Sequence, residues 1–466
     1  MLHPCLKPLT LALAGALLLS ACAVTEVSAP APAKAPEQFK EALPAQAGAS
    51  TAVPDAWWQM FQDPVLDELE RQVVIGNENL KIALAQVASA RATLDASQSA
   101  ELPTLAVGLN GTRSANVVGS GASSDPSTNV ALNASSSWEI DVWGRLSMAV
   151  RSAEASAKAS QADLTAAQLS AQATLAQSYF ALRSAELQQT LLERSVQAFQ
   201  RALDLTQQRH QGGVAALSDV LQAQTQLSST RTQLADTAAQ RAQLEHAIAV
   251  LLGQAPSSFN LAPTYKLPDK VSVPHTLPAQ LLQRRPDIAA AQLRVRAAYA
   301  QIGIADAAYF PSLSLSASAG YTQSSLASLF SAPNLAWSLG ASLSESVFDG
   351  GARQQASAQA RANASQITAS YRQTVLTALQ EVEDNLVLAN RLSEEVQSQT
   401  EALQSSQRNL DLVMEQYRAG TVSYLNVSAA QSSALGSEIS LISVRNRELA
   451  ALNILLKNIA GRWDAP

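Results

Sequence analysis

Leu102-Pro103-Thr104-Leu105 returns 208 residues later as Phe310-Pro311-Ser312-Leu313. Two further landmarks return in the same order, shifted by 206 and 207 residues: Glu139 with Trp143-Gly144 as Glu345 with Asp349-Gly350, and Gly213, Leu217, Asp219 and Val220 as Gly420, Tyr424, Asn426 and Val427. Three landmarks in one order with nearly constant spacing indicate a duplicated structural unit. We expect each copy, over 56–252 and 287–460, to contain a helix, two strands joined by a loop, a very long helix, a glycine turn and a final helix.

The longest helices are predicted where the chain lacks both Gly and Pro, over 145–211 and 352–419, which are 67 and 68 residues long. At ~1.5 Å per residue, an unbroken helix of that length reaches roughly 100 Å. Within the first run, apolar and small residues recur at every seventh position, which is typical of a coiled-coil seam. A solitary coiled-coil rod would explain these helices but would leave the strands without a role.

Glycines set the predicted ends of the helices. Each long run stops at glycine and a second helix follows, so each copy is expected to form a helical hairpin, with tips near 212 and 420. One shorter helix precedes the strands of each copy. Gly76 and Gly303 lie inside these shorter helices and are positions where they can kink or divide.

Four runs alternate apolar residues with small or polar ones and are predicted as strands, at about 104–113, 129–140, 312–322 and 335–346. A period of two over about 9–11 residues is typical of tilted strands that cross a membrane. A soluble antiparallel sheet with one buried face is the competing interpretation. Four strands cannot close a pore, and open edges are not tolerated in lipid, so membrane strands would require several chains to share one barrel. Three chains would give 4 × 3 = 12 strands, but the residues alone do not set the number at three.

The N-terminal residues 1–21 have the pattern of an export signal. Lys7 precedes an apolar stretch that is too short to span a bilayer. Leu19-Ser20-Ala21-Cys22 resembles a bacterial lipobox, so Cys22 is the predicted attachment site of a diacylglycerol and an N-acyl chain such as palmitate; an ordinary cleavage site is the alternative. Ala23, where an Asp usually retains lipoproteins in the inner membrane, favours the outer membrane. Residues 22–55 are rich in Pro and Ala and are expected to form an extended tether.

Charge and motifs exclude several classes of function. The net charge is -6 and no block of Lys or Arg occurs, which argues against nucleic-acid binding. No His pair or Cys–His pair has metal-ligand spacing, and no phosphate loop, dinucleotide motif or nucleophile motif is present, so no metal, cofactor or enzymatic activity is predicted. Glu139 and Asp141 alternate at a strand end, where a solvated rim is favoured over acid–base chemistry.

The mature chain as a whole resembles the TolC family of outer-membrane channels, and in particular its lipoprotein branch with OprM and NodT. The resemblance rests on four signatures taken together: Trp57-Trp58 with Phe61 and Asp63-Pro64; Trp138-Glu139 with Asp141 and Trp143-Gly144-Arg145; Leu281-Leu282 with Arg284-Arg285-Pro286-Asp287; and Tyr417 with Gly420. It implies an α+β membrane protein and a homotrimer. Its 12-stranded transmembrane β-barrel would continue into a long periplasmic α-helical barrel. Residues 253–286 would form a belt of mixed structure, and 461–466 a C-terminal tail.

The resemblance also implies a function and partners. Such channels dock on a periplasmic adaptor and an inner-membrane pump, here expected to be of the RND type, and conduct drugs or other solutes passively out of the cell. The expected location is the bacterial outer membrane, anchored in its lipids through Cys22. A type I protein-secretion duct and a non-pore structural coiled-coil lipoprotein of the periplasm are the alternative functions.

In this family the helical tips form the periplasmic aperture, which singles out Leu425, Asn426, Ala429, Ser432 and Asp219. OprM-like members have an Asp and an Arg where this chain has Ala429 and Ser432, and two Asp residues of TolC align with Asn426 and Ala429. The acidic ring of the second hairpin is therefore missing. Asp219 matches a commonly acidic position, with a solvated or helix-capping carboxylate as its alternative role. We expect Leu425 to close the resting aperture mainly by apolar constriction.

The tips also provide candidate contacts for the adaptor. These are the residues in and beside the two glycine turns: Arg209, Gly212, Gly213, Val214, Arg418 and Gly420. For the glycines, termination of the helix is the alternative role.

Overall fold

The computed structural model describes residues 28–31, 36, 39–41, 54–115, 117–118, 122–123, 126–271, 284–325, 327 and 335–460. The predicted signal peptide, Cys22 and the tail 461–466 lie outside the described residues, as do most of the tether and part of the predicted belt. The chain forms two compact units. One contains the described residues of Met1–Pro32, Gln86–Gln161 and Ala290–Arg372, and the other those of Ala33–Ala85, Ala162–Ala289 and Gln373–Pro466.

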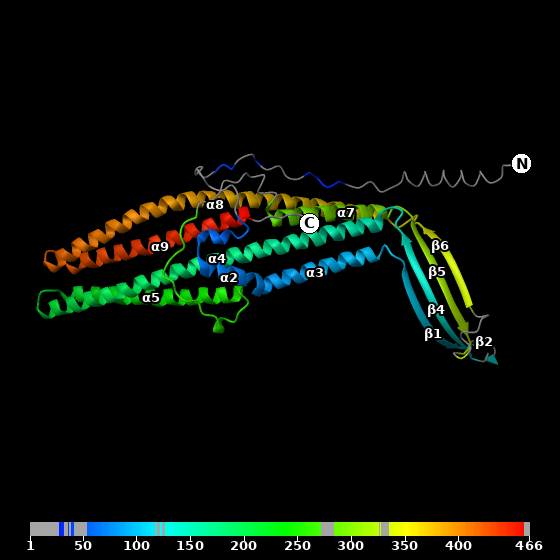
Figure 1. The fold of residues 1–466 in the computed structure, drawn as a ribbon, viewed down its shortest axis with the longest axis horizontal. Coiled ribbons are helices and arrows are strands. Elements are labelled where there is room, and N and C mark those ends of the chain that lie inside the picture. Colours follow the sequence, from blue (N-terminus) through cyan, green and yellow to red (C-terminus); the bar gives the residue numbers. More distant parts are fainter. Residues whose placement is uncertain are drawn as a thin grey trace. The chain divides into compact units, whose positions relative to one another are not determined.

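A four-stranded antiparallel sheet dominates the first unit (Figure 1). Its strands are β1 (Thr104–Ser114), β4 (Ser127–Ile140), β5 (Ser312–Gln323) and β6 (Leu335–Ser344), in the order β1-β4-β5-β6. Their ends lie within two residues of the predicted ones. The sheet therefore joins the two copies side by side, because β4 of the first pairs with β5 of the second. A further small pair, β2 (Val117–Val118) with β3 (Ala122–Ser123), lies in the segment predicted as a loop.

The register of the sheet sorts its side chains onto two unlike faces. One row of directly opposed residues is Val107, Ala134, Ala319 and Trp337, and the neighbouring row is Ala106, Ser135, Ser318 and Ser338. Opposed residues share a face, so one face is apolar across all four strands and the other is small and polar. The apolar face is not covered: the exposed fraction is 70% for Val107 and 72% for Trp337.

Both edges of this sheet are open within the described residues. β1 pairs only with β4, and β6 pairs only with β5. The edge strands have 11 and 10 residues, so each presents a long row of backbone groups without a ladder partner.

Charged residues build the turns from strand to long helix. Arg145, the first residue of α4 (Arg145–Gln211), binds the Glu139 carboxylate at 2.8 Å. The Asp141 carboxylate accepts hydrogen bonds from the backbone N–H groups of Leu146 and Ser147, at 3.0 and 2.8 Å, and thus caps the helix. The prediction that Glu139 and Asp141 share a strand face is wrong, because β4 ends at Ile140. The second copy pairs Arg353 with Glu345 at 2.7 Å in the same way.

Small residues let the helices of the first unit approach closely. The unit contains α3 (Glu78–Ser99), α7 (Pro286–Ala307) and the first parts of α4 and α8 (Ala352–Arg418). Ser152 of α4 donates to the carbonyl of Ala297 in α7 at 3.1 Å. Gly303 neither kinks nor ends α7, contrary to one prediction; it faces the side chain of Met148.

The second unit contains the hairpin formed by α4 and α5 (Leu217–Leu251), and the hairpin formed by α8 and α9 (Tyr424–Ala460), which also form hairpins in Figure 1. A short η1 (Trp57–Phe61) and α2 (Pro64–Gly76) pack against them. The Trp57 indole is fully buried and donates to Asn453 Oδ1 at 3.0 Å. Asp63 caps α2 through the N–H of Val65 at 2.9 Å. The helix predicted from 65 onward is thus divided into α2 and α3.

Gly76 marks this division because it meets the backbone of the residues that follow α5. A Cβ added to Gly76 would lie 2.0 Å from the carbonyl oxygen of Leu252, and one added to Gly253 would lie 2.1 Å from the carbonyl oxygen of Gly76. Only glycine allows two backbones to approach so closely.

Glu70 of α2 is a buried acid. Its side chain is fully buried, and neither carboxylate oxygen has a hydrogen-bond partner among the described residues. Burial, with a smaller contribution from Asp67, raises the pKa of Glu70 to about 9. The carboxyl is therefore neutral at physiological pH, as a buried acid without a cation must be.

None of the described helices is both long enough and apolar enough to cross a membrane.

We predict that Gly76→Ala strongly destabilises the protein, because the new methyl group would overlap the Leu252 carbonyl and force one backbone away. The expected loss is about 2–4 kcal/mol, seen as a lower Tm of the purified protein in detergent. Gly303→Ala is the matched control: its methyl would meet only the flexible side chain of Met148, at 2.9 Å, so its Tm should change little. Equal Tm losses for the two variants would contradict this packing argument.

We predict that Glu70→Gln stabilises the protein at alkaline pH. The folded-state pKa is about 9 and the ordinary value is 4.5, so the folded protein binds the extra proton between these limits. Stability therefore falls as pH rises through this window, and the amide removes that loss. The gain should be about 2–4 kcal/mol at pH 8 and near zero at pH 4, measured by thermal or denaturant unfolding. A gain of the same size at both pH values would rule out titration of Glu70 as the cause.

Candidate functional site

Each helical hairpin turns on a glycine with left-handed backbone, with φ 75° at Gly213 and 78° at Gly420. The N–H of Val214 donates to the Arg209 carbonyl at 2.8 Å, and the N–H of Thr421 donates to the Gln416 carbonyl at 3.0 Å. These bonds close the last turns of α4 and α8 and satisfy carbonyl groups that the helix leaves without partners. Both pairs are offset by 207 residues, so the duplication extends to single hydrogen bonds.

Arg209 joins the two tips. Its guanidinium donates to the Tyr417 carbonyl at 2.9 Å and lies 4.6 Å from the centre of the Tyr417 ring. That ring packs edge-on against the buried ring of Tyr424 at 5.8 Å. A charge-assisted hydrogen bond and a cation–π contact from one side chain make Arg209 a brace between the first and second hairpins.

The second tip separates its residues onto a buried and an exposed face. Tyr424 and Val427 are fully buried. Leu425, Ala429 and Ser432, spaced by four and three residues, lie on the exposed side, and 62% of Leu425 is exposed. The structure thus brings together the three predicted aperture residues as one stripe of α9.

Asn426 and Ser432 also make polar contacts at the tips. Asn426 accepts a hydrogen bond from the Ser423 hydroxyl at 3.3 Å, at the start of α9. Ser432 donates to Gln226 of α5 at 3.2 Å, which gives a second link between the hairpins.

The first tip exposes leucines that the sequence reasoning missed. Leu217 and Leu221 are 57% and 59% exposed and lie one turn apart at the start of α5. Their only sequence signal is this spacing of four residues. Asp219 lies between them in the first turn of α5, where the helix dipole favours an acid, and it is half-buried.

The other tip residues divide by exposure. Gly212, Val214, Arg418 and Gly420 are exposed, with Val214 at 72%, so they are open to a partner. Arg209 is half-buried against the second tip.

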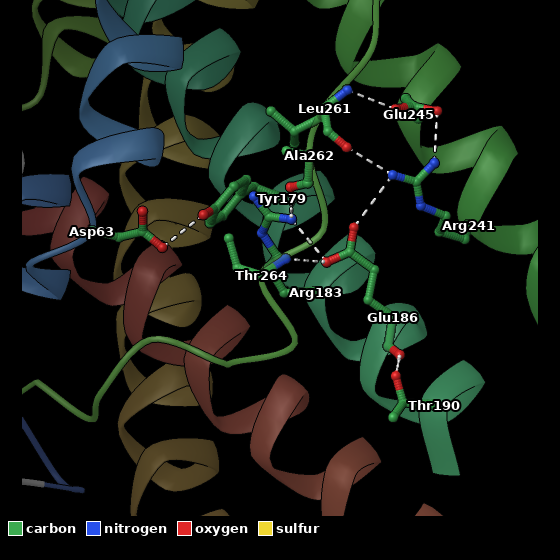
Figure 2. Close-up of polar contacts among 10 residues, drawn as sticks. All are labelled: Asp63, Tyr179, Arg183, Glu186, Thr190, Arg241, Glu245, Leu261, Ala262 and Thr264. Atoms are coloured by element: carbon green, nitrogen blue, oxygen red, sulfur yellow. Dashed lines mark hydrogen bonds and ion pairs between the residues drawn. The ribbon is translucent and has the colours of Figure 1, made fainter. Parts of the chain in front are cut away.

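The residues after α5 cross the helices of the second unit, and we call 253–271 the strap. Four charged side chains hold its backbone, as Figure 2 shows. Arg183 donates to the Ala262 carbonyl at 2.9 Å and Arg241 to the Leu261 carbonyl at 2.8 Å. Glu245 accepts from the N–H of Leu261 at 2.8 Å, and Glu186 accepts from the N–H of Thr264 at 3.3 Å.

These charges also bind one another. Arg183 pairs with Glu186 at 2.8 Å in a fully buried contact, and Arg241 pairs with Glu245 at 2.8 Å. The Arg183 guanidinium also lies 4.7 Å from the centre of the Tyr179 ring. Burial, reinforced by the hydrogen bond to Asp63 at 2.6 Å, raises the pKa of Tyr179, so its phenol stays protonated and donates. The network thus fixes the strap to both helices of the first hairpin.

A second clamp lies at the equivalent place on the second hairpin. Lys270 of the strap donates to Ser393 of α8 at 2.8 Å and pairs with Glu448 of α9 at 2.8 Å. Ser393 and Glu448 are the counterparts of Glu186 and Arg241, since 186 + 207 = 393 and 241 + 207 = 448. The two copies therefore use the same positions with different charges to bind one strap.

Among the described residues, no group of three or more His, Cys, Asp or Glu side chains is placed to hold a metal ion. What the tips offer instead is exposed apolar and small polar side chains on a braced pair of turns. Such a surface can narrow or widen a passage and can meet a protein partner.

Comparisons with known proteins agree with this arrangement. The model of the family described as outer membrane efflux protein matches residues 70–254 and 277–461. The two matches are themselves offset by 207 residues at both ends, since 277 − 70 = 207 and 461 − 254 = 207. The chain is 30% identical to the pyoverdine export outer membrane protein OpmQ of Pseudomonas aeruginosa, over 96% of each chain. It is 28% identical to the toluene efflux pump outer membrane protein TtgC of Pseudomonas putida, over 90% of this chain and 88% of that one.

Solved structures give the same result. The outer-membrane channel OprN matches 94% of this chain with 99% of its own, at a TM-score of 0.87 and 29% identity. CusC, whose structures concern transmembrane channel formation, matches 93% of this chain with 99% of its own, at a TM-score of 0.82 and 27% identity. The chain therefore belongs to the outer membrane efflux protein family, the TolC-type channels that its sequence resembles.

Proposed function

We propose that this chain is the outer-membrane channel of a tripartite efflux system and conducts small solutes passively to the exterior. The observation that supports this most strongly is the amphipathic four-stranded sheet, whose uncovered apolar face suits lipid and whose polar face suits a water-filled lumen. Relatives are named for export of pyoverdine and efflux of toluene, so the class of cargo proposed here is small organic solutes. A pump supplies the energy, and the chain itself performs no catalysis.

The working form is proposed to be a homotrimer. Because β1 and β6 both have an open edge, β1 of one chain pairs with β6 of the next, and closure occurs at 4 × 3 = 12 strands. The same three-fold arrangement surrounds a periplasmic tunnel with hairpins, two from each chain.

The lipid anchor is proposed to be on Cys22, with a diacylglycerol and an N-acyl chain in the outer membrane. The Leu19-Ser20-Ala21-Cys22 motif and the Pro/Ala-rich segment after it support this. The acyl chains add binding strength and do not by themselves span the bilayer.

The periplasmic aperture is proposed to be lined by Leu425, Ala429 and Ser432, with Asn426 and Asp219 at its rim. Because the Asp and Arg of OprM-like channels are missing from α9, closure depends on the Leu425 side chain and on the braced tips. The exposed turns at Gly212, Gly213, Val214, Arg418 and Gly420 are proposed to contact the adaptor, which in turn joins the channel to an inner-membrane pump of the RND type. Arg209 supports these turns by bracing them.

We predict that Leu425→Ala raises the conductance of the closed channel in planar bilayers, because it shortens the apolar side chain at the proposed constriction. An increase of about two-fold or more is expected from removing an apolar barrier. Leu376→Ala is the control, since Leu376 is similarly exposed, at 60%, but lies in α8 far along the chain from the tip. A closed-state conductance equal to that of the wild type would count against Leu425 as the gate. Absence of any conductance in the wild-type protein would overturn the proposed function itself.

A further inference from the structure

An open cavity of about 540 Å³ lies between α4 and α7 in the first unit. It is lined by residues of three segments: Ser28 and Ala29 of the N-terminal tether; Arg151, Glu154, Ala155 and Lys158 of α4; and Leu293, Arg296, Tyr299 and Ala300 of α7. Neither the tips nor the strap contribute to it, so its chemistry is independent of the aperture.

The cavity has an excess of positive charge. Arg151, Lys158 and Arg296 contribute three cations against the single carboxylate of Glu154, which gives a balance of +2. Glu154 is bound to Lys158 at 2.8 Å. Arg296 is exposed and forms no ion pair with any described residue. Ala155, Leu293 and the Tyr299 ring supply apolar lining beside these charges. Cations above an apolar wall suit a ligand with an anionic head and an apolar body.

Helix geometry places this cavity close to the sheet. α4 begins at Arg145, five residues after β4 ends at Ile140. Arg151 and Lys158 follow Arg145 by six and thirteen residues, which is roughly 9 and 20 Å along the helix axis. On α7, Arg296 precedes the last residue, Ala307, by eleven residues, or roughly 16 Å. If the sheet lies in the membrane, both arginines are within reach of the headgroup layer.

The tether gives a second, independent distance. Ser28 lines the cavity, and Cys22 precedes it by six residues. Six residues span at most roughly 21 Å even when fully extended. Acyl chains on Cys22 would therefore enter the leaflet within that distance of the cavity.

We propose that this cavity binds the headgroup of an anionic phospholipid in the leaflet that holds the lipidated Cys22. Arg151 and Arg296 bind the phosphate, Lys158 contributes charge, and Leu293 and Tyr299 contact the start of the acyl chains. The inference rests on the proposed outer-membrane location of the sheet, and it adds a specific lipid site that neither the lipid anchor nor the pore requires.

The test is lipid binding to the purified full-length protein in detergent, with phosphatidylglycerol and phosphatidylcholine as probes and bound lipid counted by native mass spectrometry. Wild-type protein should prefer phosphatidylglycerol, and the double variant R151Q/R296Q should lose affinity about 25-fold, since each basic group near an anionic surface is worth about five-fold. R151K/R296K keeps both charges and should retain most of the binding. Unchanged binding of phosphatidylglycerol by R151Q/R296Q would overturn the proposal.

Two further controls separate the sources of the effect. R201Q/R408Q removes two exposed arginines of α4 and α8 that do not line the cavity, and it should bind phosphatidylglycerol like the wild type. Soluble glycerol phosphate at the same concentration should not displace the lipid; complete displacement would identify a site for free phosphate instead. Conductance of R151Q/R296Q should match the wild type, so loss of lipid binding with normal conductance supports the lipid site. Preserved lipid binding without conductance in the wild type would sink only the channel function.

Discussion

The two open edges of the sheet are the constraint on which the rest of the account depends. A backbone N–H or carbonyl without a partner costs several kcal/mol in lipid, on the order of the whole stability of a domain when summed over an edge. β1 and β6 each present such an edge, while their apolar side chains remain uncovered. One chain therefore cannot be the finished structure. Pairing of β1 with β6 of another copy removes both problems together, and it makes the assembly a closed ring.

The duplication determines how one chain meets that constraint. Each copy supplies two strands and one helical hairpin, and the copies are joined directly through β4 and β5. The 207-residue offset is repeated in the tip hydrogen bonds and in the family matches. It is repeated again in the strap, which binds the Glu186 position of one hairpin and the equivalent Ser393 position of the other. One segment thus links two similar hairpins through different charges. Arg209 and Ser432 link the same hairpins near their tips.

Much of this fold was predictable because its signals are local. Alternation of apolar and small residues located the four strands to within two residues, and the lack of Gly and Pro located the long helices. The effect of single glycines was not predictable: Gly76 ends a helix because another backbone lies against it, whereas Gly303 faces a flexible side chain and leaves α7 intact. Both outcomes depend on residues distant in sequence.

The site was predictable in part for the same reason. Leu425, Ala429 and Ser432 were singled out from the family resemblance, and their helical spacing suffices to place them on one face. The brace made by Arg209 and the clamp made by Arg183 and its partners join residues up to about 208 positions apart, so no local pattern reveals them. Glutamate and arginine at these positions read as ordinary charged residues of a solvated helix until the strap is placed against them.

The most direct test of the account is the mass of the assembled particle. The protein extracted from membranes in mild detergent should be weighed by native mass spectrometry, with cross-linking before extraction to record the state in the membrane. We expect a single species of three chains, and a cross-linked ladder that stops at three, because three four-stranded sheets close one barrel without free edges. A stable monomer, or an assembly of any other number, would contradict closure by three copies and with it the central claim.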